Sequence, residues 1–247
     1  MILPILFYTV RKTDMNLTKL RIDGIPAIIW GEPSDKMIIA AHGSHSSKID
    51  DCMWILAEEA VNKGYQVLSF DFPQHGERVY EKDFIMPDKC VRELKIMYSY
   101  AAKHSKKISV FGCSMGAYFQ LLAFADSDIE RALFLSPVTD MNRIIHNLMD
   151  YCHITEEEFR ERVIVENDIE TLYFPYYEYV KSHPITSWNH NTCILRGKKD
   201  TLCEYELVKY FSDIFCCELT EQNDARHWFH TESEMYSFRN WLKERLL

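Results

Sequence analysis

The feature that most constrains the fold is a glycine-spaced turn in the middle of the chain. The apolar run at 107–111 leads into Gly-Cys-Ser-Met-Gly at 112–116, and a helix-forming run follows directly. This order predicts a strand, one sharp turn and a helix, with Ser114 at the turn. A residue held at such a turn is strained, and Gly112 and Gly116 remove the Cβ atoms that would collide with neighbouring chain. The pattern therefore predicts an exposed serine hydroxyl at the end of a buried strand.

A serine at such a turn is useful for catalysis only when other groups activate it. Its hydroxyl is a poor nucleophile at neutral pH, so an imidazole must take its proton and a carboxylate must orient that imidazole. The helix after the turn would leave the backbone N–H of Met115 at its N-terminus, where it can stabilise an oxyanion. The alternative is a tight turn with an inert serine.

The rest of the chain predicts the sheet that this turn requires. With 247 residues, 47% of them hydrophobic, the chain can bury a large core, and one globular domain with an insertion is expected. Short apolar runs alternate with amphipathic segments, which favours an α/β fold with a mostly parallel, doubly wound sheet. A hairpin is expected at 17–30, further strands at 37–41, 66–72, 107–111, 131–136, 192–197 and 215–219, and helices at 49–63, 87–104, 203–214 and 231–247.

The glycines indicate which edge of this sheet carries the site. Five of the eight follow directly after expected strands, namely Gly43, Gly76, Gly112, Gly116 and Gly197. Such clustering is typical of an α/β sheet whose functional loops lie at the carboxyl ends of its strands.

Residues 138–191 break the alternation of strands and helices. The stretch lacks an apolar strand of the earlier kind, but it contains amphipathic pieces and a capping signal at 155–158. It is too long for a plain crossover, so we expect a helical cap at 138–191 over a core formed by residues 1–137 and 192–247. Its aromatic side chains are expected partly to line a substrate pocket and partly to form its own core: Tyr173, Phe174, Tyr176, Tyr177 and Trp188.

Asp200 and His227 are the candidates for the acid and the base. Asp200 follows the expected strand at 192–197 and His227 follows the last strand, so both should lie at the same sheet edge as Ser114. Serine, acid and histidine also occur in the chain order that this kind of turn requires. Three alternatives stay open at this point: Asp224 or Glu204 for the acid, and His230 for the base.

The loop after the strand at 37–41 is expected to supply a second oxyanion donor. A sharp turn at His42 and Gly43 would leave the backbone N–H of Ser44 facing the same point as that of Met115.

The remaining histidines and Cys113 have structural interpretations. His42 and His75 are expected to bond loop backbone, and Cys113 is interpreted as a small filler under the sheet. No metal and no cofactor are expected, because the histidines outside the triad lack the spacing of a metal site: His42, His45, His75, His183 and His190.

Composition narrows the expected partners and compartment. The formal charge of −9 argues against nucleic acid and leaves a small molecule as the expected partner. None of the eight cysteines forms a Cys-x-x-Cys pair, so reduced thiols and a cytoplasmic location are expected. A monomer or a homodimer is expected. Residues 1–10 are apolar but about half the length of a membrane span. They predict a strand or a packed arm, with a short signal remnant as the alternative.

These motifs together resemble the α/β-hydrolase superfamily over residues from about 17 to 247. The resemblance rests on His-Gly at 42–43, Asp-Phe-Pro-Gln-His-Gly at 71–76, Gly-Cys-Ser-Met-Gly at 112–116, Asp200 and His227. Within the superfamily, the sequence is similar to small bacterial serine esterases with a helical cap, whereas haloalkane dehalogenases and epoxide hydrolases use an aspartate in place of the serine. The resemblance implies a triad of Ser114, Asp200 and His227 with Ser44 and Met115 as oxyanion donors.

The sequence departs from the family where relatives often have a glycine before the histidine, since Ala225 and Arg226 precede His227 here. The expected function is a serine hydrolase that cleaves small carboxylic esters through an acyl-enzyme. The tyrosines of the cap favour short to medium acyl or aryl esters over long lipid chains. A thioesterase and an acylaminoacyl-type peptidase are the alternatives within the same chemistry, and a catalytically silent ligand-binding protein on the same fold is the alternative outside it.

Overall fold

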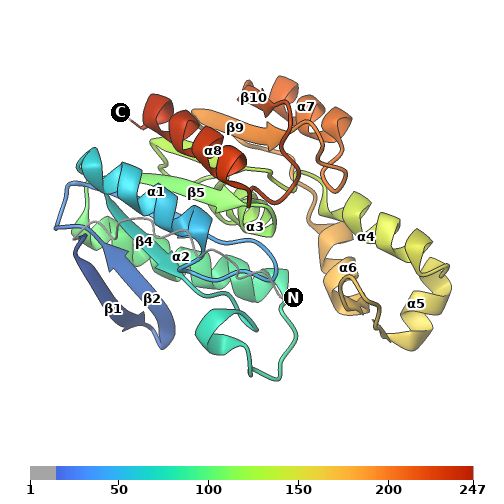
Figure 1. The fold of residues 1–247 in the computed structure, drawn as a ribbon. Helices are drawn as coiled ribbons and strands as arrows, with labels where there is room; N and C mark the ends of the chain where they lie inside the picture. The colour runs from blue at the N-terminus through green and yellow to red at the C-terminus, as the bar shows by residue number, and fades with distance from the viewer. Residues whose placement is uncertain (1–14, 247) are drawn as a thin grey trace, which may run out of the picture.

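An eight-stranded sheet organises the molecule (Figure 1). The computed structural model describes residues 15–246. The strand order is β1-β2-β4-β3-β5-β6-β9-β10, and β2 runs antiparallel to both neighbours while all pairs from β4 to β10 are parallel. This confirms the predicted hairpin and the mostly parallel sheet. The strands are β1 (Leu17–Ile22), β2 (Ile25–Trp30), β3 (Lys36–Ala41), β4 (Gln66–Phe70), β5 (Lys107–Cys113), β6 (Arg131–Leu135), β9 (Thr192–Gly197) and β10 (Glu218–Gln222).

Helices cover both faces of the sheet because its central strands are apolar on both sides. In β3, Ile38 packs in the core beneath α1 (Asp51–Asn62) and α8 (Glu232–Arg245), whereas the next residue, Ile39, packs in the core of the opposite face. Successive side chains of a strand point to opposite faces, so a strand buried on both sides must be apolar throughout. The opposite face carries α2 (Pro87–His104), α3 (Met115–Phe124) and α7 (Tyr205–Ile214).

Residues 138–191 form a group of helices with a small ribbon. In Figure 1 they lie to the right of the sheet, on the side where α3 follows β5. The capping signal is confirmed, because Thr155 and Glu158 form the two reciprocal hydrogen bonds of a capping box. The elements are α4 (Met141–Tyr151), α5 (Glu156–Arg162), β7 (Ile164–Val165), β8 (Leu172–Tyr173) and α6 (Phe174–Ser182), and α6 packs against both α4 and α2.

The last strand begins three residues later than the predicted 215–219. Phe215 still belongs to the end of α7, where its N–H bonds to Phe211 O at 3.0 Å. Cys216 then adopts a positive φ of 53°, and the chain turns before β10 starts at Glu218. The apolar residues that suggested a strand instead close the helix against the core, while the strand itself is a polar edge strand. The prediction for residues 1–10 lies outside the described residues.

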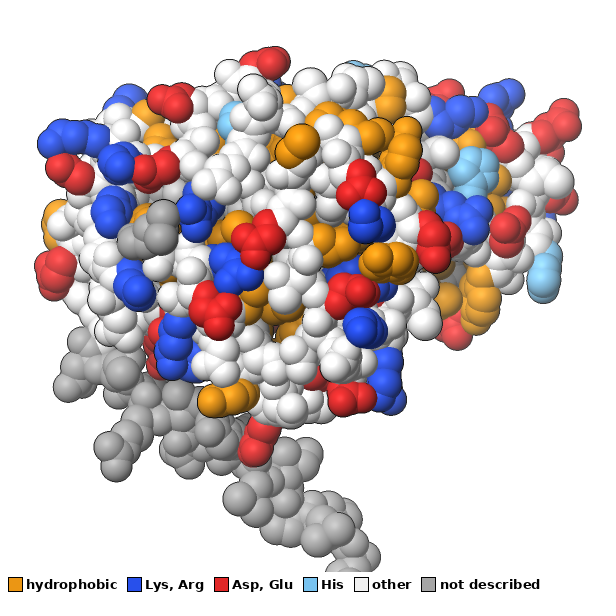
Figure 2. Space-filling model, turned by 90° about the horizontal axis from the view of Figure 1, so that it is seen from above, with side chains coloured by type: hydrophobic (Ala, Val, Ile, Leu, Met, Phe, Trp, Pro, Cys, Tyr) orange, Lys and Arg blue, Asp and Glu red, His pale blue; other side chains and the backbone are white. Residues whose placement is uncertain are grey.

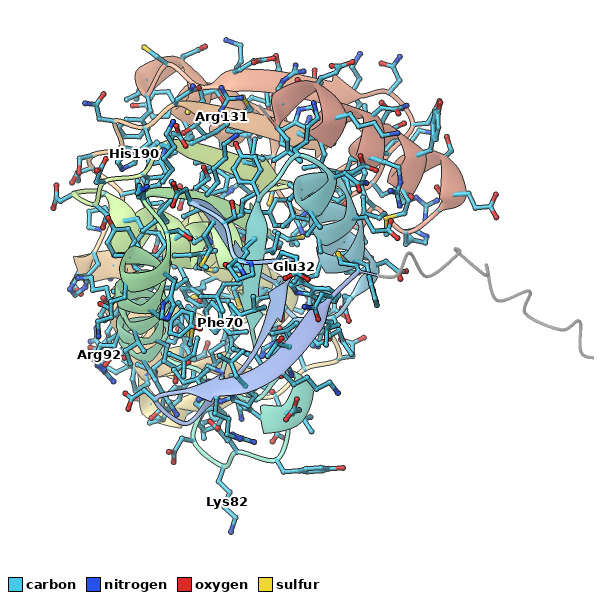
Figure 3. All side chains as sticks on the ribbon, turned by 90° about the vertical axis from the view of Figure 1, so that its left-hand side faces the viewer. Glu32, Phe70, Lys82, Arg92, Arg131 and His190 are labelled. Atoms are coloured by element: carbon cyan, nitrogen blue, oxygen red, sulfur yellow. The ribbon has the colours of Figure 1, made fainter. Side chains whose placement is uncertain are left out.

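Apolar side chains mostly lie in the interior, and most charged side chains lie on the surface. Figure 3 shows Phe70 of β4 in the interior, whereas Lys82 projects outward from the loop between β4 and α2. Acidic and basic side chains are interspersed on the face seen in Figure 2. None of the helices between residues 15 and 246 has the length and apolar character that a transmembrane span requires.

Candidate active site

Ser114 lies at a strained turn between β5 and α3. Its φ of 51° and ψ of −117° are unfavourable for a residue with a side chain. The neighbouring glycines explain how the chain tolerates this turn. A Cβ at Gly112 would lie 2.6 Å from Ala117 Cα, and one at Gly116 would lie 2.4 Å from His42 O. The sequence pattern thus produces the expected strand, turn and helix.

Ser114, His227 and Asp200 form a continuous chain of hydrogen bonds. Ser114 Oγ and His227 Nε2 are 2.9 Å apart, and His227 Nδ1 and Asp200 Oδ2 are also 2.9 Å apart. The Asp200 side chain is fully buried, and that of His227 is 8% exposed. A buried carboxylate bonded to one ring nitrogen holds the imidazole in the tautomer whose other nitrogen accepts a proton from serine.

Asp200 is itself held by the loop that follows β9. Its Oδ1 accepts hydrogen bonds from the backbone N–H groups of Leu202 and Cys203, both at 2.9 Å. The two carboxylate oxygens therefore have separate tasks, because Oδ1 fixes the loop and Oδ2 faces the imidazole. Such anchoring stabilises a single orientation of the side chain.

The three alternative residues lie elsewhere. Asp224 is exposed and pairs with Lys199, and Glu204 pairs with Arg143 on α4. The ring of His230 is exposed, and its Nδ1 lies 2.6 Å from Trp228 O. The structure brings none of the three into the chain of bonds that starts at Ser114.

Glu234 holds the His227 loop, a role that was not predicted from the sequence. Its Oε1 accepts from Arg226 N at 3.0 Å, and its Oε2 accepts from His230 N at 3.1 Å and Thr231 N at 2.9 Å. Burial would raise the pKa of Glu234, but these backbone donors lower it to about 2. Thr231 and Glu234 have the spacing of a capping box, which in sequence signals a helix start and not an anchor for the loop before it.

Gly197 lets the end of β9 approach the backbone that precedes His227. A Cβ at Gly197 would lie 2.2 Å from Ala225 O, and Lys199 N donates to that same oxygen at 2.9 Å. The end of β9 therefore touches the backbone just before the histidine. Only a residue without a Cβ fits at position 197 against this backbone.

The loop after β3 lies directly against Ser114. A Cβ at Gly43 would be 3.3 Å from Ser114 Cβ. Among residues 15–246, neither the Ser44 N–H nor the Met115 N–H donates to a protein acceptor. Met115 begins α3, where the N–H groups of the first turn have no intrahelical partner.

His42 braces this loop, as predicted. Its Nε2 accepts from Phe72 N at 3.1 Å, so Nδ1 carries the proton and donates to Gly43 O at 2.7 Å. Complete burial lowers the pKa of His42 to about 4, so the ring is neutral at ordinary pH. His75 is also structural, because its ring bonds to Pro73 O and His45 N.

A buried ion pair joins the loops after β3 and β4. Asp71 is fully buried, pairs with the Lys48 ammonium and accepts from Lys48 N at 2.9 Å and Glu77 N at 3.0 Å. A Cβ at Gly76 would collide with this carboxylate. The glycine at 76 therefore serves the packing of the loop.

The cap aromatics divide into several groups. Phe174 and Tyr177 are buried against Phe159 in the core of the cap, with ring centroids 5.3 and 5.8 Å from it. The Tyr177 hydroxyl donates to Glu156 at 2.8 Å. Tyr173 instead stacks on Phe84 from the loop before α2, at 4.4 Å. The first two rings thus belong to the predicted internal core of the cap.

The prediction that Trp188 lines the site is wrong. Its indole packs against Phe134 and donates to Thr192 Oγ1 at 2.7 Å. Thr192 begins β9 at the amino ends of the parallel strands, opposite the edge that carries Ser114. The last helix of residues 138–191, α6, ends at Ser182, before Trp188. The chain then returns to the amino ends of the strands, because β9 runs parallel to β6.

Only one group of side chains among residues 15–246 has the donor arrangement of a metal site. It consists of Asp200, Cys203 and His227, whose donor atoms lie within 4.8 Å of one another. The carboxylate and the imidazole already bind each other, and burial raises the pKa of the Cys203 thiol well above its usual range. A metal would need the thiolate and would disrupt the bond between His227 and Asp200, so these residues fit a proton-transfer chain better than a metal centre.

Known proteins share this architecture. No family model matches the chain. It is 31% identical over 114 residues to the α/β hydrolase ucsC of an Acremonium species, a match that covers 42% of this chain and 23% of that protein. The chain thus spans less than a quarter of the length of this curated relative.

Solved structures resemble the chain over almost its whole length. Est1E from Butyrivibrio proteoclasticus with bound ferulic acid has a TM-score of 0.71 at 19% identity, over 92% of this chain and 97% of that one. The esterase Pf2001 from Pyrococcus furiosus has a TM-score of 0.68 at 23% identity, over 94% and 91%. The strand order, the strained turn at Ser114 and these similarities all indicate the same fold. The predicted superfamily resemblance is confirmed at the level of the fold: the chain has the α/β-hydrolase fold.

Proposed function

We propose that the protein is a serine hydrolase that cleaves small carboxylic esters through an acyl-enzyme at Ser114. The observation that carries the proposal is the continuous chain from Ser114 Oγ through His227 to buried Asp200, with both bonds at 2.9 Å. Inert serines at tight turns have no need of a neutral imidazole fixed against them by a buried carboxylate. The name of one similar solved structure, the Pyrococcus furiosus esterase Pf2001, supports the same reaction class.

The proton moves along this chain in both halves of the reaction. Ser114 Oγ attacks the ester carbonyl carbon while its proton passes to His227 Nε2. Asp200 stabilises the resulting imidazolium through Nδ1–H. His227 then gives the proton to the departing alkoxide as the ester C–O bond breaks. A water molecule repeats the sequence, because His227 takes its proton as the water attacks the acyl group and returns it to Ser114 Oγ when the acid leaves.

The backbone amides of Ser44 and Met115 would bind the negative oxygen that forms in each step. Both lie beside Ser114 and lack protein acceptors among the described residues, and the N-terminus of α3 adds a favourable dipole. Ser44 is also fastened from the cap side, since its Oγ donates to Glu170 Oε2 at 2.8 Å. In this proposal, residues 138–191 act as the cap that limits the substrate, and no cofactor takes part.

A fluorophosphonate probe tests the proposal directly. The wild-type protein should be labelled at Ser114, and the Ser114→Ala variant should not be labelled at all. A panel of p-nitrophenyl esters, run beside acyl-CoA thioesters and peptide amides, should show turnover of the esters. Labelling at Cys113 or at another serine, or turnover of thioesters or amides in preference to esters, would contradict the proposal.

A further inference from the structure

Arg196 is a buried cation close to the loop that carries Asp200. It lies in β9, one residue before Gly197, and its side chain is only 2% exposed. Its Nη1 donates to Glu221 Oε1 at 2.6 Å, and the two residues are direct neighbours across β9 and β10. Burial of a charge is costly even when the charge is paired, so packing alone does not explain a guanidinium at this position.

The other arm of the guanidinium reaches the Asp200 loop. Arg196 Nη2 donates to Asp200 O at 3.3 Å and to Cys203 O at 3.2 Å. The Asp200 carboxylate meanwhile accepts from the N–H groups of residues 202 and 203 in the same loop. Arg196 thus fixes the loop through its carbonyls and Asp200 fixes it through its amides, while Asp200 Oδ2 faces His227.

An aromatic ring supports the guanidinium as well. The central carbon of Arg196 lies 5.4 Å from the centroid of the Tyr205 ring, at the start of α7. In Figure 1, α7 lies beside β10, and β10 pairs with β9. Arg196 Nε has no acceptor among residues 15–246. The contacts are therefore incomplete for Arg196 itself, whereas both carbonyls of the loop receive a donor.

A forked cation is needed for this set of contacts. A guanidinium carries its N–H donors in one rigid plane, so one arm can bind a carboxylate while the other binds the carbonyls of a loop. The single nitrogen of a lysine is a point charge on a flexible stem and does not reproduce this fork. A methionine fills the interior but donates to neither partner.

We propose that Arg196 is a positioning residue, which holds the Asp200 carboxylate in line with His227 Nδ1 through Asp200 O and Cys203 O. The inference rests on the proposed serine hydrolase function. In that function, Asp200 stabilises the imidazolium that forms when Ser114 loses its proton, and a misplacement on the order of 1 Å in such an arrangement can cost about 100-fold in rate. Arg196 acts only through the loop, so its effect should fall on kcat and not on substrate binding.

Arg196→Met tests the assignment with p-nitrophenyl acetate as substrate. We expect kcat to fall by about 10- to 100-fold while KM stays within about twofold, and fluorophosphonate labelling of Ser114 to slow by a similar factor. The downfield proton NMR resonance of His227 Nδ1–H, which reports its bond to Asp200, should shift or broaden. Arg196→Lys keeps a charge opposite Glu221, so its thermal midpoint should stay close to that of the wild type while kcat still falls by about fivefold or more.

Arg245→Met is the matched control. Arg245 pairs with Glu218 at the other end of β10, and its Nε is also buried without an acceptor among the described residues. This variant should lose thermal stability without a change in kcat or in the His227 resonance.

Four outcomes would overturn the assignment: wild-type kcat in Arg196→Met or Arg196→Lys, a loss that falls on KM instead of kcat, an unchanged His227 resonance in Arg196→Met, or an equal fall of kcat in the Arg245→Met control. Labelling of Ser114 and ester turnover by the wild type test the proposed function separately, because neither measurement involves a change at Arg196.

Discussion

The loops at the carboxyl edge of the sheet and the cap are built in different ways. Around the triad, buried side chains and close backbone contacts hold each group, as Glu234 and Gly197 do for the His227 loop. The cap has one small aromatic core around Phe159, and many of its polar contacts are partly exposed, such as the pair of Lys181 with Glu156. Under the proposed function, this contrast predicts preorganised chemistry at the sheet edge and a cap that tolerates substitution.

Several contacts connect these two regions, and some of them reach the loops that follow β3 and β4. Glu170 from the cap accepts from Ser44 Oγ, and its Oε2 lies 3.2 Å from His45 Nε2. Tyr173 stacks on Phe84 of the loop that follows β4. Substitutions in the core should therefore change the rate for every ester, whereas substitutions in the cap should change which ester is preferred.

The largest effect is expected for Ser114→Ala. Under the proposed function, removal of the nucleophile should lower kcat by about 10⁶-fold for all esters. The thermal midpoint should change little, because the serine side chain is not part of the core. Enzyme assays and calorimetry on the same sample test both statements. Substantial residual turnover would mean that another group attacks the ester.

Asp200→Asn should have the next largest effect. An amide can hold His227 in the wrong tautomer, so kcat should fall by about 10⁴-fold with little change in unfolding free energy. Asp224→Asn is the matched control, because Asp224 is exposed and pairs only with Lys199 among the described residues. If the control were the crippled variant, the acid would be misassigned.

Glu234→Gln should have an intermediate effect through the His227 loop. Loss of the carboxylate weakens several charge-assisted hydrogen bonds, so we expect about 2 kcal/mol of destabilisation and about a tenfold loss of kcat. Glu232→Gln changes the same charge at an exposed position of the same helix and should be near neutral. Equal effects in the two variants would show that helix charge, rather than the loop anchor, is responsible.

The pH dependence of Glu234 sharpens that test. Its pKa falls from an ordinary 4.5 to about 2 on folding. The unfolded state thus binds the proton more readily, so the stabilisation is complete above pH 4.5 and is lost as the pH falls toward 2. Denaturant titrations across this window should show a shallower pH dependence for Glu234→Gln than for the wild type. Parallel curves would contradict the assigned pKa shift.

The smallest effect on rate is expected in the cap. Tyr173→Ala removes the stack on Phe84 and should shift relative kcat/KM within a series of p-nitrophenyl esters by a few fold, with little loss of stability. Phe159→Ala should instead destabilise by about 3–5 kcal/mol, because it empties the aromatic core of the cap. An unchanged ester profile in Tyr173→Ala would show that Tyr173 does not influence substrate preference.

Much of the site was predictable because it depends on local sequence. The glycines at 112 and 116 can be interpreted without a structure, since a sharp turn between a strand and a helix needs them at that spacing. Asp200 and His227 were predictable from their places after strands of a parallel sheet. Trp188 was mispredicted because sequence distance from the cap does not reveal the edge to which the chain has returned.

The sequence by itself determined the order of strands and helices, the sharp turn at Ser114 and the candidate acids and bases beside it. Each of these is encoded by periodicity, glycine spacing or chain order. Only the tertiary structure decided among the alternative acids, assigned Glu234 and Gly197 to the support of the His227 loop, and placed Arg196 against the Asp200 loop. These features arise from contacts between segments far apart in the chain. Whether a buried polar atom has a partner depends on what the folded chain places next to it, and a local pattern carries no record of that.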